Sequence, residues 1–288
     1  MKNTGPLIIL IFLILLSACS QRSAKDEEEP IQKKETAFGT AHKESDHPDT
    51  SAVEKQQEQK QQEEKQQVPA ENAVKPSKAQ YRLNPANWSF KPIGNANPKV
   101  ALLTFDDAPD KYALDIAKSL KSLGVQAIFF VNGHFIATEQ GKAKLKQIHD
   151  MGFWIGNHTY DHVSLKDLPG KQQYSEIVKL NDEIQAIIGQ RPKFFRAPFG
   201  LNTDYTRKVA ADEKMLLMNW TYGYDWEKDF QEKGALTKIM LETPYLVNGA
   251  NLLLHDRSWT SEAIAGIVKG LKEKGYDILD PALIEVPK

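Results

Sequence analysis

The stretch KVALLTFDDAPDKYALDIAKSLKSLGVQAIFFV (99–131) alternates two kinds of hydrophobic pattern. KVALLTF (99–105) and VQAIFFV (125–131) are short apolar runs, which are typical of buried strands. Between them, Ala113, Ile116, Ala117 and Leu120 recur at helical spacing, and Gly124 ends the pattern. The stretch therefore predicts a strand–helix–strand unit with two parallel strands.

The same alternation continues towards the C-terminus. Further strands are expected at 153–157, 193–198, 214–220, 250–256 and 276–279, and further helices at 142–152, 174–189 and 260–275, the last with Thr260 as its N-cap. Regular strand–helix alternation predicts an α/β fold with a parallel sheet and helices outside it. Because the strands are evenly spaced, we expect a barrel-like sheet of seven or eight strands in a domain over residues 81–288.

The first residues carry an export signal. MKNTGPLIILIFLILLSAC (1–19) places Lys2 before ten apolar residues and ends on Cys19, the only cysteine of the chain. Ten apolar residues are too few to span a bilayer, which needs about 20, but they suit a signal peptide. LSAC resembles the bacterial lipobox, so we expect residues 1–18 to be removed and Cys19 to carry a lipid anchor. Ordinary cleavage, with Cys19 lost or left as a spare thiol, is the alternative.

Residues 19–80 are predicted to be a disordered linker. EKQQEQKQQEEKQQ (54–67) contains only Glu, Lys and Gln, and such a composition cannot bury enough apolar surface to offset the entropy lost on folding. About 60 flexible residues give an end-to-end distance of roughly 40–45 Å. This reach suits a domain that is tethered to a bacterial cell membrane and acts outside the cytoplasm.

Charge excludes one class of partner. The chain has 37 Lys and Arg against 38 Asp and Glu, and the two kinds also nearly cancel within the predicted domain. Because no basic face is indicated, we do not expect nucleic acid as a ligand. We expect a monomer.

Titratable side chains follow the predicted strands at their C-terminal ends. They are Asp106 and Asp107, His158 and His162, Arg196, Asp225, and His255. In parallel α/β folds the chemistry takes place at these ends. Burial of polar side chains costs free energy, so five such placements at one edge of the sheet indicate that they serve one site.

His158 and His162 are candidate metal ligands. Four residues apart, they would share one helical face, and a carboxylate from Asp106 or Asp107 would complete a two-histidine, one-aspartate set. Three protein ligands leave positions open for water and substrate, as in catalytic zinc sites, and the second carboxylate could act as general base. The alternative is a pair of surface histidines. His134 and His149 lack such neighbours and are interpreted as peripheral.

Other residues at the strand ends have candidate roles beside a metal. Arg196 could fix a carboxylate through bidentate contacts, unless it forms a surface ion pair. His255 could protonate a leaving group if Asp225 orients it, unless it is a satisfied core histidine. Trp226 and Leu253 would line an apolar pocket, or simply pack.

Five short motifs occur in a fixed order: TFDD (104–107), HTYDH (158–162), RAPFG (196–200), DW (225–226) and LLLHD (252–256). In this order and at these intervals they resemble the motifs of polysaccharide deacetylases, the NodB-homology domain of carbohydrate esterase family four. The likeness covers about residues 97–280. It implies a distorted (β/α) barrel and hydrolysis of N-acetyl groups on a glycan.

The resemblance also implies a role for each residue. Asp106 would be the catalytic base, oriented by Arg196, and Asp107, His158 and His162 would bind zinc, or cobalt or manganese in its place. The N–H of Phe199, beside Pro198, would stabilise the oxyanion. His255 would be the general acid, with its pKa adjusted by Asp225, and Trp226 and Leu253 would contact the acetyl methyl. Because an exported lipoprotein meets cell-wall glycan, peptidoglycan N-acetylglucosamine is the favoured substrate.

Three positions depart from the family pattern. Ala108 replaces a glycine after the Asp pair, Phe199 replaces a tyrosine, and Tyr222 replaces an aspartate three residues before Asp225. The last change affects the expected rim beside the acid. An O-acetyl glycan esterase and a catalytically silent glycan-binding lipoprotein remain as alternatives.

Overall fold

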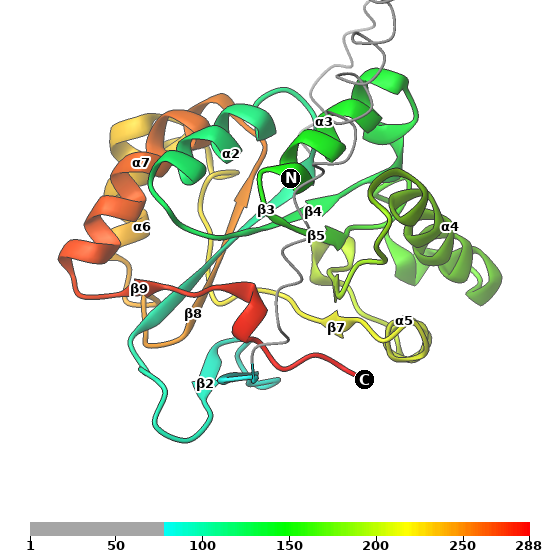
Figure 1. Ribbon diagram of the computed structural model, residues 1–288, viewed down its shortest axis with the longest axis horizontal. Coiled ribbons are helices and arrows are strands. Elements are labelled where there is room, and N and C mark those ends of the chain that lie inside the picture. Colours follow the sequence, from blue (N-terminus) through cyan, green and yellow to red (C-terminus); the bar gives the residue numbers. More distant parts are fainter. Residues whose placement is uncertain (1–77) are drawn as a thin grey trace, which may run out of the picture. The chain divides into compact units, whose positions relative to one another are not determined.

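The computed structural model describes residues 78–288 (Figure 1). The predictions for residues 1–77, which include the signal peptide, the lipidated Cys19 and most of the linker, lie outside this range. Within the described part, no helix is both long enough and apolar enough to cross a membrane.

A curled, parallel, seven-stranded sheet forms the centre of the domain, as predicted. Its strands are β3 (Val100–Ala108), β4 (Ile128–Val131), β5 (Trp154–Asn157), β6 (Phe194–Phe195), β7 (Leu216–Leu217), β8 (Ala250–His255) and β9 (Asp277–Ile278). The order is β7-β6-β5-β4-β3-β8, with β9 also paired to β3. After β7 the chain returns to β8 through a parallel bridge between Tyr222 and Leu252. This bridge links the segment after β7 to β8 at one point, and the sheet is a curled half-barrel.

Alternation along β3 separates two hydrophobic cores. Ala101, Leu103 and Phe105 belong to the larger core, whereas Val100 and Leu102 belong to a second core. Because successive side chains of a strand point to opposite faces, residues 104 and 106 lie on the same face as residues 100 and 102. The sequence period thus directs the first aspartate into the barrel interior.

Amphipathic helices cover the outer face of the sheet (Figure 1). They are α2 (Ala113–Ser122), α3 (Glu139–Asp150), α4 (Gly170–Ile188), α5 (Asp204–Asp212), α6 (Lys233–Glu242) and α7 (Ser258–Glu273). The predicted apolar stripe of α2 is buried and belongs to the larger core. The predictions did not include α5 and α6. The predicted N-cap of the last helix is wrong, because α7 begins after Arg257.

A short hairpin lies against the C-terminal segment. Strands β1 (Tyr81–Leu83) and β2 (Phe90–Pro92) pair antiparallel, and Tyr81 bridges to Ile284. Tyr81 and Phe90 are buried in the second core, and the N–H of Phe90 donates to the carbonyl of Gly249, just before β8. The hairpin therefore packs near the start of β8, away from the strand ends that carry the site.

Candidate active site

Asp106 and Arg196 form a buried ion pair in the barrel interior. Arg196 Nη1 lies 2.6 Å from Asp106 Oδ1 and also donates to Thr104 Oγ1 at 2.8 Å. The guanidinium further donates to the carbonyls of Met218 and Asn219, at 3.4 and 3.0 Å. Arg196 has no exposed surface and Asp106 only 2%. The surface-ion-pair interpretation of Arg196 is therefore wrong, and Asp106 is held in one orientation.

Arg196 also orients the first histidine through its backbone. The carbonyl of Arg196 lies 2.8 Å from His158 Nδ1, so this nitrogen carries the proton and donates. The other ring nitrogen, Nε2, faces the site and lies 3.4 Å from Asp106 Oδ2. A hydrogen bond that fixes the tautomer in this way is typical of metal-binding histidines.

Asp107, His158 and His162 converge on one point. One ligand atom from each lies within 4.8 Å of the others, and His162 Nε2 is 3.5 Å from Asp107 Oδ1. The residues between the histidines are not helical, so the predicted shared helical face is wrong. Left-handed backbone at Asp107 (φ 60°), Thr159 (φ 68°) and His162 (φ 55°) turns the side chains inwards instead. Two nitrogens and one carboxylate oxygen are the donor set that suits zinc.

The electrostatics of the cluster favour the forms that bind a cation. Burial opposes ionisation of Asp107, but the charges of His158, His255, His162 and Arg257 outweigh it and lower the pKa of Asp107. Burial and the neighbouring His158 lower the pKa of His162, against the opposing effect of Asp107. The ionised form of Asp107 and the neutral form of His162 are the ones that bind metals.

His255 and Asp225 form a second hydrogen-bonded pair. His255 Nδ1 lies 2.7 Å from Asp225 Oδ1, and the His255 backbone N–H donates to Asp225 Oδ2 at 2.6 Å. Burial works to lower the pKa of His255, but the charge and hydrogen bond of Asp225 overcome it and raise that pKa. Because β3 and β8 pair with Asp106 in register with His255, the histidine lies beside the carboxylate on the neighbouring strand.

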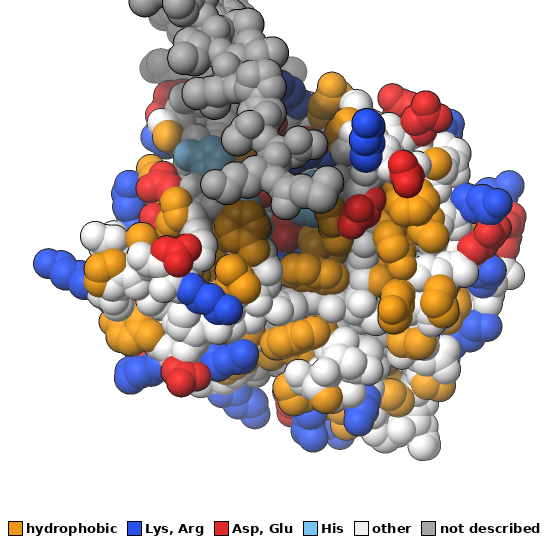
Figure 2. Space-filling model, turned by 180° about the vertical axis from the view of Figure 1, so that it is seen from behind, with side chains coloured by type: hydrophobic (Ala, Val, Ile, Leu, Met, Phe, Trp, Pro, Cys, Tyr) orange, Lys and Arg blue, Asp and Glu red, His pale blue; other side chains and the backbone are white. Residues whose placement is uncertain are grey.

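Aromatic side chains border this site, and Figure 2 shows hydrophobic side chains beside histidines on this face. The Phe199 ring lies 5.0 Å from that of His162, and the Trp226 ring 5.5 Å from that of His255. Phe199 has left-handed backbone (φ 60°), and its N–H has no hydrogen-bond partner among residues 78–288. Leu253 and Pro198 are buried, so they pack beneath the surface of the site.

The departures from the family pattern leave the cluster intact. Tyr222 is buried, belongs to the larger core and donates to the carbonyl of Met240 in α6 at 2.7 Å. Tyr222 itself therefore does not line the rim beside the acid, and its effect on substrate choice stays a prediction. Ala108 is buried at the end of β3. His134 and His149 are not part of the cluster of possible metal ligands.

The supporting roles of three residues were not predicted from the sequence. Arg257 Nη2 donates to Asp107 Oδ2 at 2.8 Å, and Thr260 Oγ1 donates to Asp225 Oδ2 at 2.7 Å. Buried Asp256 accepts from the N–H groups of Asp110 and Tyr112 and so ties β8 to the loop after the Asp pair. The only sequence signal was their proximity to His255 along the chain.

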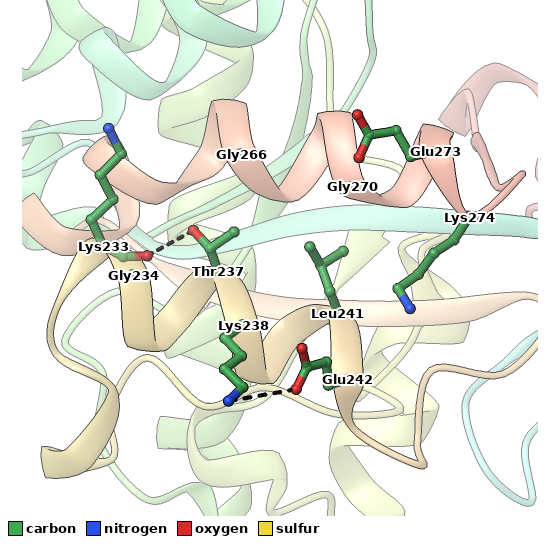
Figure 3. A pocket seen from close by; sticks show the side chains of 10 residues that line it. All are labelled: Lys233, Gly234, Thr237, Lys238, Leu241, Glu242, Gly266, Gly270, Glu273 and Lys274. Atoms are coloured by element: carbon green, nitrogen blue, oxygen red, sulfur yellow. Dashed lines mark hydrogen bonds and ion pairs between the residues drawn. The ribbon is translucent and has the colours of Figure 1, made fainter.

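A separate groove of about 560 Å³ lies between α6 and α7 (Figure 3). Its lining residues are Lys233, Gly234, Thr237, Lys238, Leu241, Glu242, Gly266, Gly270, Glu273 and Lys274. The lining contains no histidine and no residue of the predicted site.

Known proteins are similar to this chain in sequence and fold. The polysaccharide deacetylase family model matches residues 93–217. A peptidoglycan-N-acetylglucosamine deacetylase of Bacillus cereus is 32% identical over 209 residues, covering 70% of this chain and 74% of the relative. The uncharacterized protein YlxY of Bacillus subtilis is 30% identical over 210 residues, 70% of this chain, and this chain spans only 61% of that relative's length.

A solved structure gives the same result. The crystal structure of BA3943, a family-four carbohydrate esterase pseudoenzyme of Bacillus anthracis, superimposes with a TM-score of 0.59 at 30% identity, covering 67% of this chain and 69% of that one. With the motifs in place on a curled parallel sheet, these likenesses show that the chain belongs to the polysaccharide deacetylase family, carbohydrate esterase family four.

Proposed function

We propose that this protein is a metal-dependent hydrolase that removes N-acetyl groups from a cell-wall glycan, with peptidoglycan N-acetylglucosamine as the favoured substrate. One observation carries the proposal. The Asp107–His158–His162 cluster lies beside Asp106, which Arg196 orients, and His255 stands on the neighbouring strand. A ligand set, a base and an acid at one rim are the parts that amide hydrolysis by water requires.

The residues divide the chemistry between them. The cluster would hold a divalent cation, most simply zinc, which supplies Lewis-acid polarisation of the acetamide carbonyl and activation of water. Asp106 accepts a proton from the attacking water. The N–H of Phe199 donates to the carbonyl oxygen as it gains negative charge. His255, whose pKa Asp225 raises, donates a proton to the departing amine.

The location of the enzyme is part of the proposal. Lipid attached to Cys19 would anchor the protein to the outer side of the bacterial cell membrane, and residues 19–80 would let the domain reach wall glycan. The support is the apolar run ending in LSAC and the Glu-, Lys- and Gln-rich segment. Labelling with a radioactive fatty acid checks the anchor, because Cys19→Ala should abolish labelling and release the protein.

Acetate release tests the activity directly. The purified protein is offered peptidoglycan, chitin oligomers and poly-N-acetylglucosamine, and released acetate is measured before chelation, after it, and after return of zinc or cobalt. We expect release from peptidoglycan, loss with the chelator, and recovery with the metal. The matched control is Asp106→Asn, which keeps the size of the side chain but removes the base. Absence of acetate from every substrate would refute the activity.

Two alternatives give different results in the same assays. An ester expels an alkoxide, which can leave with less help from a general acid than the nitrogen of an amide can. His255→Ala would therefore spare ester hydrolysis and abolish amide hydrolysis. A silent glycan-binding protein has a specific precedent in the BA3943 pseudoenzyme. This chain retains the ligand set, Asp106 and His255, which favours catalysis. Glycan binding without acetate release would identify the silent protein.

A further inference from the structure

Exposed hydrophobic side chains are unevenly distributed over the described residues. The large hydrophobic residues that are exposed are Val163, Tyr174, Phe199, Tyr205, Trp226, Tyr245 and Val247. The first five lie in segments that follow β5, β6 and β7 in the chain, and the last two lie in the loop before β8. Single exposed hydrophobic residues are ordinary, whereas a group beside a site marks a binding surface.

Tyr174 and Tyr205 lie close together although 31 positions separate them. A side chain built at Gly170 would begin 3.5 Å from the Tyr205 ring, so this ring packs against the first residue of α4. Tyr174 lies four residues further along α4, on the same helical face as Gly170. Thr203 Oγ1, before α5, donates to Gln173 Oε1 at 2.7 Å and joins the two helix starts. The tyrosines nevertheless remain 47% and 41% exposed.

This pair continues from the aromatic border of the active site. Phe199 is 62% exposed, with its ring 5.0 Å from that of His162. Five residues lie between Phe199 and Tyr205, so the six steps of chain hold their Cα atoms at most about 20 Å apart. The loop after His162 leads to Gly170, the first residue of α4, against which Tyr205 packs. The two tyrosines thus lie in the first turns of α4 and α5, the helices that follow β5 and β6, at the rim where those strands end.

We propose that Tyr174 and Tyr205, continuing from Phe199, bind sugars of the glycan strand beyond the one whose acetamide reacts. This inference rests on the proposed deacetylase function and assigns the contacts with neighbouring sugars to these two side chains. A pyranose ring presents a face of C–H groups that packs on an aromatic ring, while the phenol hydroxyl can hydrogen-bond to sugar hydroxyls. The surface therefore selects for strand length rather than for the chemistry of the reacting acetyl group.

Chain-length dependence tests the proposal. Acetate release is measured on a chitin disaccharide and hexasaccharide with the unaltered protein, the Tyr174→Ala/Tyr205→Ala variant and the Tyr245→Ala variant. Tyr245 is the matched control, because it is 59% exposed but lies in the loop before β8. We expect the hexasaccharide-to-disaccharide ratio of kcat/KM to fall about tenfold in the double variant, mainly through KM. Tyr245→Ala should leave the ratio unchanged, and Tyr174→Phe/Tyr205→Phe should retain most of it. An unchanged ratio in the double alanine variant would overturn the inference.

A binding assay separates this inference from the proposed function. Sedimentation with insoluble chitin is measured in the Asp106→Asn background, in which no product forms. The double alanine variant should bind about tenfold more weakly than Asp106→Asn alone, whether or not the unaltered protein releases acetate. Equal binding would reject the tyrosine surface, and absence of acetate with weakened binding would reject only the deacetylase.

Discussion

Replacement of Arg196 by methionine should destabilise the fold strongly. The substitution fills a similar volume but leaves Asp106 without its counter-charge, and both side chains are almost completely buried. Removing one partner of a buried ion pair costs about 3–5 kcal/mol. The change also abolishes the hydrogen bonds to Thr104, Met218 and Asn219. Because a domain is stable by only about 5–15 kcal/mol, the expected loss is a large fraction of the total.

Urea unfolding, followed by far-ultraviolet circular dichroism, measures this cost. The matched control is Arg191→Met, because Arg191 also pairs with two carboxylates but is 32% exposed; surface pairs contribute about 0–1 kcal/mol. The double variant Arg196→Met/Asp106→Asn should recover much of the lost stability, since no buried charge then lacks a partner. A loss below about 1 kcal/mol for Arg196→Met would refute the buried-pair reasoning.

Three further predictions concern the supporting residues. Because Asp225 raises the pKa of His255, the acid stays protonated to higher pH, and activity should fall as pH rises through that pKa. In Asp225→Asn the fall should begin at lower pH, and kcat should be about 10²–10⁴-fold lower. An unshifted pH–rate profile would contradict this role. Asp256→Ala removes a buried acceptor of backbone N–H groups and should cost about 1–3 kcal/mol in urea unfolding; an unchanged midpoint would count against it. Tyr222→Phe loses the hydrogen bond to Met240, which should lower the free energy of unfolding by about 1 kcal/mol while acetate release is retained. Loss of acetate release from a variant that is still folded would place Tyr222 at the rim.

The strand–helix order could be predicted because it depends on local patterns. Apolar runs such as 99–105 and 250–256 became β3 and β8, and the strand ends brought Asp106 and His255 together. The missed helix α5 begins at Asp204 and has few apolar residues, of which Val209 and Ala210 are buried. Its stability depends on packing against neighbours, which periodicity alone does not reveal.

The details of the site depended on tertiary structure. The i, i+4 spacing of His158 and His162 gave the correct pairing for the wrong reason, because left-handed residues rather than a helical turn bring them together. Arg257 contacts Asp107 across 150 positions, and a single sequence contains no signal for such a contact. Thr260 resembled an N-cap, yet its hydroxyl bonds to Asp225, since α7 starts earlier than its hydrophobic pattern indicates.

Metal stoichiometry tests the central claim most directly. The protein is stripped with a chelator, dialysed against excess zinc and then against metal-free buffer, and its zinc content is measured by plasma mass spectrometry. We predict about one zinc per chain, a near-complete loss in His158→Ala and His162→Ala, and no loss in the controls His134→Ala and His149→Ala. Equal zinc in the cluster variants and the controls, or no zinc in the unaltered protein, would contradict the account.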